Sequence, residues 1–221
     1  MENSTERGGL NTDLPHAVAG LEPLSLGTKI GIFSDVHGAT RTLERALERC
    51  DESGVETIAL LGDLFDRHEQ ADGCAAALAG WSVVGVYGNH EREVALLAAA
   101  GELELLEETV RFLSGLQEDV LIDDVHLTHE SSHWGHQDPV ARMFGRGSHF
   151  NGHTPKARMT FAGHTHFRVA RDERGTLDIA RGSLAIEPTR RYLINPGALM
   201  IGQYAIWDRD EHVIFFRNVE Y

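Results

Sequence analysis

Residues 29–38 read Lys29-Ile30-Gly31-Ile32-Phe33-Ser34-Asp35-Val36-His37-Gly38, and the prediction of the fold starts from this pattern. Its apolar first half predicts a short buried strand that stops just before the polar residues Asp35 and His37. A helix is predicted directly afterwards, because apolar residues recur there at the spacing i, i+3, i+4 and i+7: Leu43, Ala46, Leu47 and Cys50. A buried strand, a polar turn and an amphipathic helix in this order are typical of a βαβ unit.

The same unit repeats along the first half of the chain. The next predicted strands are 55–61, which stops at Gly62-Asp63, and 81–87, which stops at Gly88-Asn89-His90-Glu91. Helices are predicted at 71–80 and at 93–116, the second with a break near Gly101. This alternation predicts a parallel sheet that is buried on both faces.

The second half of the chain has a different pattern, with short strands close together. A hairpin is predicted from 120–122 and 125–128 around Asp123-Asp124, and a long polar stretch at 130–156 follows it. Further strands are predicted at 159–162, 167–170, 177–180, 192–194, 201–207 and 212–217. We expect these strands to form a second sheet on the first, giving an α/β fold: a four-layer α/β/β/α sandwich of two mixed sheets flanked by helices.

Composition supports a single globular domain. The chain has 221 residues, of which 42% are hydrophobic and 24% charged, so it can bury a substantial core. Residues 1–27 mix Gly, Pro, Asn, Ser and Thr without a clear period, and we expect a loosely ordered lead-in there followed by one domain at 28–221.

Charge and cysteine content narrow the possible partners and the compartment. The net charge of −14, from 20 Lys+Arg against 34 Asp+Glu, disfavours bulk nucleic-acid binding. No apolar run approaches the roughly 20 residues that a membrane helix needs. The start of the chain carries acids and no apolar stretch, and Cys50 and Cys74 form no CxxC pair. We therefore expect a cytoplasmic protein, and its oligomeric state stays open.

Three predicted strands in succession end in residue types that bind metals. Asp35 and His37 follow the first strand, Asp63 the second, and Asn89 and His90 the third. Ligands bind beyond the carboxyl ends of the strands in open α/β sheets, so these side chains are expected to converge. The second half adds His129, His164 and His166, each after a predicted strand. Oxygen and nitrogen donors without thiolate suit Mn²⁺, Fe or Zn²⁺.

These blocks together resemble a known family. Asp35-Val36-His37, Gly62-Asp63, Gly88-Asn89-His90-Glu91, His129 and Gly163-His164-Thr165-His166 look like the five ordered motifs of the calcineurin-like metallophosphoesterases. The resemblance runs from about residue 29 to the end. Residues 62–67 and Glu91 resemble the protein phosphatase and diadenosine tetraphosphatase branch, whereas the C-terminal half, with 194–198, is similar to small bacterial phosphodiesterases.

The resemblance implies two divalent metal ions and a set of ligands for each. Asp35, His37 and His166 would hold one ion, Asn89, His129 and His164 the other, and Asp63 would bridge both. Two cations roughly 3.5–4 Å apart can share a carboxylate, acidify a bridging water and clamp the oxygens of a phosphoryl group during in-line displacement.

Three further residues are candidates for catalysis. His90 adjoins a predicted ligand and is placed to protonate the leaving oxygen. Asp66 would orient the His90 ring and keep it protonated, and Arg67 would pair with phosphate oxygens. The alternative for Asp66 and Arg67 is an ordinary surface ion pair, which stabilises a fold very little.

Other polar residues have simpler interpretations. The alternative for His129 is an ordinary surface histidine. Four further histidines are interpreted as solvated residues of a loop that covers the cleft and sets specificity: His133, His136, His149 and His153. Glu91 at a helix start is explained by the helix dipole. Residues 195–197 are interpreted as a structural turn near the site.

The sequence therefore predicts a binuclear-metal-dependent phosphoesterase that hydrolyses phosphate mono- or diesters through a metal-bridging hydroxide. The expected substrate is a nucleotide, a dinucleoside polyphosphate or a phosphopeptide. One alternative is a non-catalytic metal-binding scaffold on the same fold. The other is a nuclease, against which the acidic composition argues.

Overall fold

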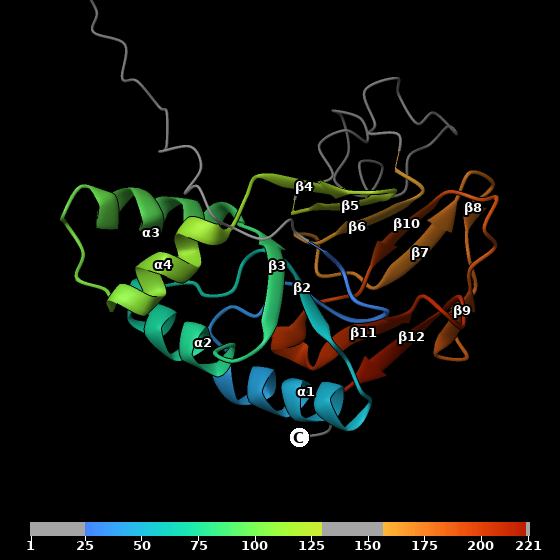
Figure 1. Ribbon diagram of the computed structural model, residues 1–221, viewed down its shortest axis with the longest axis horizontal. Helices are drawn as coiled ribbons and strands as arrows, with labels where there is room; N and C mark the ends of the chain where they lie inside the picture. Colours follow the sequence, from blue (N-terminus) through green and yellow to red (C-terminus); the bar gives the residue numbers. More distant parts are fainter. Residues whose placement is uncertain (1–24, 130–156, 220–221) are drawn as a thin grey trace, which may run out of the picture.

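Two six-stranded sheets stack face to face in the computed structural model, which describes residues 25–129 and 157–219 (Figure 1). Most of the predicted lead-in and the whole stretch at 130–156, with its four histidines, lie outside the described residues. The α/β class and the two mixed sheets flanked by helices are confirmed.

The first sheet combines the parallel strands of the βαβ units with the C-terminal hairpin. Strands β1, β2 and β3 pair in parallel, and β11 joins β1 antiparallel on its other side. The sheet order is β3 (Ser82–Val86), β2 (Thr57–Leu61), β1 (Lys29–Phe33), β11 (Gln203–Asp208), β12 (Val213–Asn218) and β9 (Ser183–Ala185). Because β1 lies between β2 and β11, it is a central strand with paired backbone on both edges.

The second sheet is built entirely by the chain after the helices. Strand β6 pairs in parallel with both β5 and β10, and the remaining pairs are antiparallel. Its order is β4 (Asp119–Ile122), β5 (Val125–Thr128), β6 (Met159–Ala162), β10 (Tyr192–Asn195), β7 (Val169–Asp172) and β8 (Gly175–Thr176).

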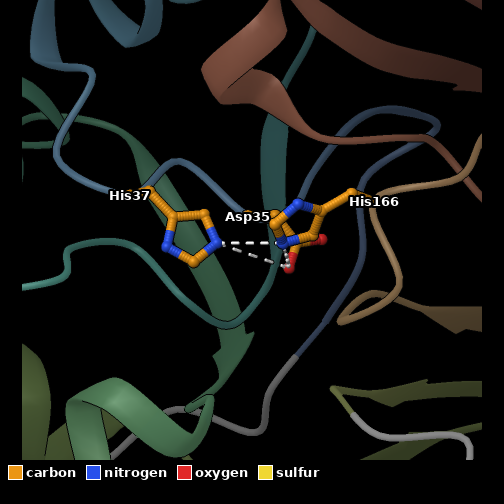
Figure 2. Close-up of side chains that lie close together, drawn as sticks. All are labelled: Asp35, His37 and His166. Carbon is orange, nitrogen blue, oxygen red and sulfur yellow. Dashed lines mark hydrogen bonds and ion pairs between the residues drawn. The ribbon is translucent and has the colours of Figure 1, made fainter.

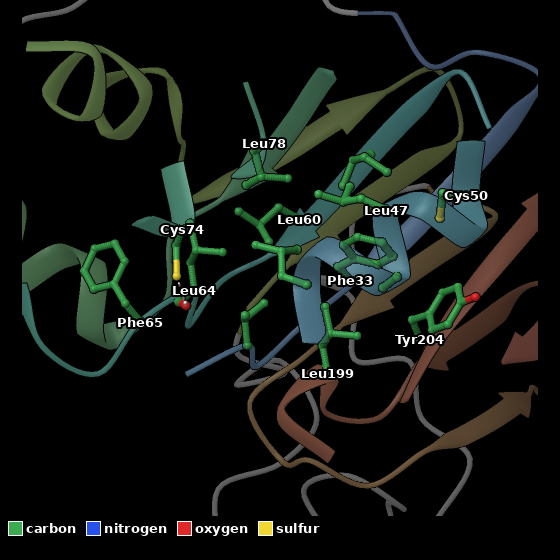
Figure 3. Packing of buried hydrophobic residues seen from close by; sticks show 14 of the residues in the cluster. Phe33, Leu47, Cys50, Leu60, Leu64, Phe65, Cys74, Leu78, Leu199 and Tyr204 are labelled. Carbon is green, nitrogen blue, oxygen red and sulfur yellow. Dashed lines mark hydrogen bonds between the residues drawn. The ribbon is translucent and has the colours of Figure 1, made fainter. Parts of the chain in front are cut away.

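The helices pack on the outer face of the first sheet (Figure 3). The predicted apolar stripe of the first helix is its buried face, which contacts Phe33 of β1 and Leu60 of β2 in one hydrophobic cluster. The described helices are α1 (Thr40–Glu52), α2 (Ala71–Ala77), α3 (Asn89–Ala99) and α4 (Glu107–Gly115), with short 3-10 turns η1 (His68–Gln70) and η3 (Leu199–Ile201). All of these described helices and turns lie on the side of the first sheet or in the loops that connect its strands. A helical layer outside the second sheet therefore stays a prediction.

A second hydrophobic cluster fills the space between the sheets. Ile30 and Ile32 of β1 contribute to it, whereas Phe33 belongs to the helical side, as the alternation of a strand requires. Phe161 of β6 and Trp207 of β11 meet across the sheets with ring centroids 5.3 Å apart. With both faces of the first sheet covered, the near-continuous apolar runs in its parallel strands are explained.

One predicted strand is wrong, and several boundaries shift. The strands predicted at 201–207 and 212–217 were expected in the second sheet, but they belong to the first. Residues 177–180 form no strand, because the Asp178 side chain accepts a hydrogen bond from the Ala180 N–H at 2.9 Å and turns the chain. Leu177 and Ile179 nevertheless pack against the core between the sheets, which explains their apolar pattern. The strand predicted at 167–170 begins at Val169, and the helix predicted from 93 begins at Asn89.

The predicted break near Gly101 is confirmed, since α3 and α4 are separate helices and Gly101 has a φ of 73°. Within residues 25–129 and 157–219, none of the helices is both long enough and apolar enough to cross a bilayer.

Candidate metal centre

The predicted ligands lie on loops that meet at one edge of the stacked sheets. The loops after β1 and β2 are joined by backbone hydrogen bonds, from Asp35 N–H to the Gly62 carbonyl and from His37 N–H to the Asp63 carbonyl, both at 3.0 Å. The loop after β6 reaches them from the second sheet, because the His164 N–H donates to the Asp35 carboxylate at 3.1 Å. The two sheets therefore present their ligand loops to each other.

The first group of ligand atoms comes from Asp35, His37 and His166 (Figure 2). The Nε2 atoms of the two histidines are 3.0 Å apart. Oδ1 of Asp35 lies 3.4 Å from the His166 Nε2 and 4.0 Å from the His37 Nε2. Asp35 is fully buried, and its other oxygen accepts a hydrogen bond from the Ser34 hydroxyl at 2.6 Å.

The second group contains Asp63, His129 and His164, with Asn89 beside them. The His129 Nε2 atom is at its centre, 3.2 Å from Oδ2 of Asp63 and 3.3 Å from Oδ1 of Asn89. The His164 Nδ1 atom lies 3.2 Å from the same nitrogen. All four residues were predicted as ligands, and His129 is buried at the site instead of lying on the surface.

Asp63 lies between the two groups. Its Oδ2 atom, 3.2 Å from the His129 Nε2, is also 4.0 Å from the His37 Nε2 of the first group. Its Oδ1 atom accepts a hydrogen bond from the His90 N–H at 3.3 Å. This is the position that a carboxylate shared by two ions requires.

The hydrogen-bonding pattern tests whether these residues fit cations. The His129 Nδ1 atom faces the Leu61 carbonyl oxygen at 2.7 Å, so Nδ1 carries a proton and donates it. In the neutral ring, Nε2 then presents a lone pair to the carboxylate of Asp63 and the amide oxygen of Asn89. Facing lone pairs repel unless a proton or a metal ion lies between them. The donor set therefore fits a divalent cation with nitrogen and oxygen ligands.

Five of the seven predicted ligands have backbone conformations that are uncommon outside glycine. Their φ angles are positive: Asp35 54°, His37 48°, Asp63 53°, His164 68° and His166 63°. Among the other described non-glycine residues, only Asp123 and His212 share this feature, and both lie in strand-connecting turns. Left-handed conformations of non-glycine residues cost of order 1–3 kcal/mol each and cluster at functional sites. The loops thus hold their side chains in place at a cost in stability.

Glu91 organises the loop that carries Asp63, a role that the sequence interpretation missed. Its side chain is only 1% exposed and accepts backbone N–H groups on both oxygens. Oε2 accepts those of Asp63 at 2.9 Å and Gly88 at 2.6 Å, and Oε1 accepts those of Leu64 and Phe65. The helix dipole alone is therefore an incomplete explanation. The detectable signal was a glutamate three residues after Gly88, at the third position of a helix.

Asn195 has a comparable role on the opposite loop. Its amide nitrogen donates to the Gly163 carbonyl at 2.9 Å and the Thr165 hydroxyl at 3.2 Å, and its oxygen accepts the Gly197 N–H at 2.8 Å. These bonds fasten the loop that carries His164 and His166. The interpretation of 195–197 as a structural turn near the site is confirmed.

Two glycines allow the loops to approach closely. A Cβ atom at Gly88 would lie 2.0 Å from Oδ1 of Asp63, and one at Gly62 would lie 2.7 Å from Nδ1 of His129. Both distances are far below van der Waals contact, so a larger residue at either position displaces a ligand.

The electrostatics of the second group follow from the Asp63–His129 pair. Burial tends to raise the pKa of Asp63, but the hydrogen bond and charge of His129 outweigh burial, and the pKa is lowered. Burial tends to lower the pKa of His129, but the hydrogen bond to Asp63 and the negative charge of Asp63 outweigh burial, so the pKa of His129 is raised. In the first group, the hydrogen bond to Asp35 raises the pKa of His166. Each shift reports a site that attracts positive charge.

The three candidates for catalysis lie beside the ligands. The His90 ring stands edge-on to that of His37, with centroids 5.4 Å apart, and it is partly exposed. The Asp66 carboxylate bonds to Nδ1 of His37, and its distance to Nδ1 of His90 is 3.8 Å, too long for a hydrogen bond. Arg67 is exposed, and no ion pair joins it to Asp66 in the described part of the chain.

Comparison with known proteins gives one family and one fold. Residues 28–206 match the model of the calcineurin-like phosphoesterase superfamily domain. An uncharacterized protein of Methanocaldococcus jannaschii is 24% identical over 224 residues, covering 87% of each chain.

Two solved structures share the fold at low sequence identity. A metallophosphoesterase from Sphaerobacter thermophilus aligns with a TM-score of 0.64 and 24% identity, covering 87% of this chain and 88% of the other. An archaeal phosphodiesterase aligns with a TM-score of 0.53 and 21% identity, covering 86% and 99%.

Proposed function

Because this chain belongs to the calcineurin-like phosphoesterase superfamily, we propose that it is a phosphoesterase that depends on two divalent metal ions. One observation carries the proposal: two groups of nitrogen and oxygen donors share the Asp63 carboxylate. A structural zinc site would need only one closed set of four ligands. Two adjoining sets with a shared carboxylate are the arrangement used for phosphoryl chemistry.

The proposed ligands follow two of the three groups that the geometry forms, and the third group joins His37 and Asp63 to His90. Asp35, His37 and His166 hold one ion, and Asn89, His129 and His164 hold the other, with Asp63 between them. A pair of divalent ions, when bound, lowers the pKa of water and stabilises negative charge on phosphoryl oxygens. Manganese, iron and zinc all accept this donor set.

His90 is the proposed proton donor to the leaving oxygen. Its backbone N–H donates to Oδ1 of Asp63 at 3.3 Å, which holds its main chain beside the centre, and its side chain is partly exposed. Histidine is the side chain that most often transfers a proton to or from a reacting group in enzymes. Arg67, exposed on the adjoining loop, is the proposed partner of the phosphate oxygens.

The proposed substrates are small phosphate mono- or diesters: nucleotides, dinucleoside polyphosphates or phosphopeptides. The solved archaeal relative in fold is a phosphodiesterase, which favours including diesters. The high negative charge of the chain repels long polyanions, and this argues against a nuclease.

The test uses p-nitrophenyl phosphate and its bis ester, with the chelated protein and the same protein reloaded with Mn²⁺. We expect hydrolysis only after reloading, and its loss in Asp63→Ala. Asp51→Ala, which removes an exposed carboxylate on α1, is the matched control and keeps the activity. A panel of mononucleotides, cyclic nucleotides, dinucleoside polyphosphates and phosphopeptides then separates the substrate classes. Tight metal binding with no hydrolysis of any of them would instead identify a metal-binding scaffold.

A further inference from the structure

Asp66 contacts two histidines with the same carboxylate oxygen, and the two contacts are unequal. Oδ1 of Asp66 is hydrogen-bonded to Nδ1 of His37, whereas Nδ1 of His90 is 3.8 Å from this oxygen. Hydrogen bonds between such groups have heavy-atom distances of about 2.7–3.2 Å. Of the two rings, the one that Asp66 holds is therefore that of His37.

We propose that Asp66 is a positioning residue for the metal ligand His37, an inference that rests on the proposed function. A proton on Nδ1, donated to the Asp66 carboxylate, leaves Nε2 without a hydrogen in the neutral ring. Nε2 is the atom that faces the first group: it lies 3.0 Å from the His166 Nε2 and 4.0 Å from Oδ1 of Asp35 (Figure 2). Asp66 thus selects the tautomer that can bind an ion and fixes the direction of its lone pair.

The backbone around Asp66 is held by hydrogen bonds within its own loop. The N–H groups of Asp66 and Arg67 both donate to the Gln70 side-chain oxygen at 3.0 Å. The loop bearing His37 is tied to the same segment, since the Gly38 N–H donates to the Leu64 carbonyl at 2.9 Å. The carboxylate and the imidazole are therefore carried by one hydrogen-bonded unit, and little entropy is lost when they pair.

In each group one histidine makes a hydrogen bond through the ring nitrogen that points away from the metal site, and the two acceptors are of different kinds. In the second group, the His129 Nδ1 faces the main-chain carbonyl of Leu61, which no substitution removes. In the first group, the corresponding partner of His37 is the side chain of Asp66. Substituting Asp66 is expected to weaken the binding of one ion and to leave the binding of the other unchanged. The second ion therefore serves as an internal control in each variant.

Asp66 is also a suitable residue to substitute. Its side chain is 46% exposed, so its removal leaves no buried cavity and the variants are expected to fold. Asparagine keeps an oxygen that can accept from Nδ1 and loses only the charge, whereas alanine removes the acceptor altogether. The two variants therefore separate loss of the acceptor from loss of the charge.

The experiment titrates chelated wild type, Asp66→Ala, Asp66→Asn and His90→Ala with Mn²⁺, following heat and the free-ion EPR signal. We expect two ions in the wild type and in His90→Ala. In Asp66→Ala, one of the two ions should bind about 10–100-fold more weakly, and the affinity for the other should be unchanged. In Asp66→Asn, the loss of affinity for that ion should be smaller. At Mn²⁺ concentrations that saturate both sites, Asp66→Ala should recover most of its rate of p-nitrophenyl phosphate hydrolysis.

Unchanged affinity for both ions in Asp66→Ala, together with a fall in kcat matching that of His90→Ala, would overturn the inference and place Asp66 on His90. An equal loss of both ions would overturn it as well. If the wild type bound no ion, the proposed function itself would fail. That result can be distinguished from both outcomes that would overturn the role of Asp66, because each of those requires a wild type that binds two ions.

Discussion

Glu91→Gln gives a sharp test of how the loop carrying Asp63 is held. The carboxylate of Glu91 accepts two backbone N–H groups on each oxygen, from Asp63 and Gly88 on one and from Leu64 and Phe65 on the other. Glutamine has the same shape but offers one oxygen and one NH₂ group. Whichever way the amide turns, two backbone N–H groups face another donor.

The size of the effect follows from those two donors. Glu91 is 1% exposed, so water cannot replace the lost acceptor without the loop opening. A buried donor without a partner costs about 1–3 kcal/mol, so two of them lower the free energy of unfolding by about 2–6 kcal/mol. Because either pair includes the N–H of Asp63 or that of the next residue, Leu64, the affinity for metal should fall as well.

Urea unfolding of the chelated protein, followed by circular dichroism, measures the stability, and Mn²⁺ titration measures the affinity. Glu93→Gln is the matched control, since Glu93 lies on the same helix with an exposed side chain. It should change the free energy of unfolding by no more than about 0.5 kcal/mol. If Glu91→Gln proved as stable as Glu93→Gln, the carboxylate would not be holding the loop.

Three further outcomes are expected. Gly88→Ala should lose Mn²⁺ affinity and activity, because its Cβ would lie 2.0 Å from Oδ1 of Asp63. Gly115→Ala, whose Cβ would meet no neighbouring side chain within 4 Å, should bind Mn²⁺ normally, and its free energy of unfolding should rise by about 0.4–1 kcal/mol. His90→Ala should retain both ions by metal analysis but lose rate, most severely with poor leaving groups; loss of an ion would contradict its role as proton donor. The raised pKa values of His129 and His166 stabilise the metal-free protein fully below about pH 6.5, and this contribution is lost as the pH rises through the folded values. Mn²⁺ affinity should therefore rise over the same interval above pH 6.5, and a Kd independent of pH by calorimetry would refute this.

The parts of the fold that the sequence predicted are those governed by local pattern. The apolar runs of β1, β5 and β6 coincide with their predicted ranges, because buried strands flanked by polar turns have few alternative interpretations. The order of Asp35, Asp63 and Asn89 after successive parallel strands was also enough to predict their convergence. Parallel neighbours end at the same edge of a sheet, so the topology brought those side chains together.

The parts that could not be predicted depend on contacts distant in sequence. Residues 177–180 have the alternation of a strand, but the Asp178 side chain competes for the backbone. Of the four hydrogen bonds to Glu91, only the one from Gly88 follows from its spacing in sequence. The other three come from Asp63, Leu64 and Phe65 on a different loop, and no local pattern indicates them. The pairing of Asp66 with His37 in preference to His90 depends on a carboxylate orientation that only the folded loops define.

Whether two ions share the Asp63 carboxylate can be seen by anomalous diffraction from crystals grown with Mn²⁺. We expect two anomalous peaks about 3.5–4 Å apart, with Asp63 contacting both and with His37 and His129 on opposite sides. A single peak, or two peaks with Asp63 turned away from either one, would contradict it.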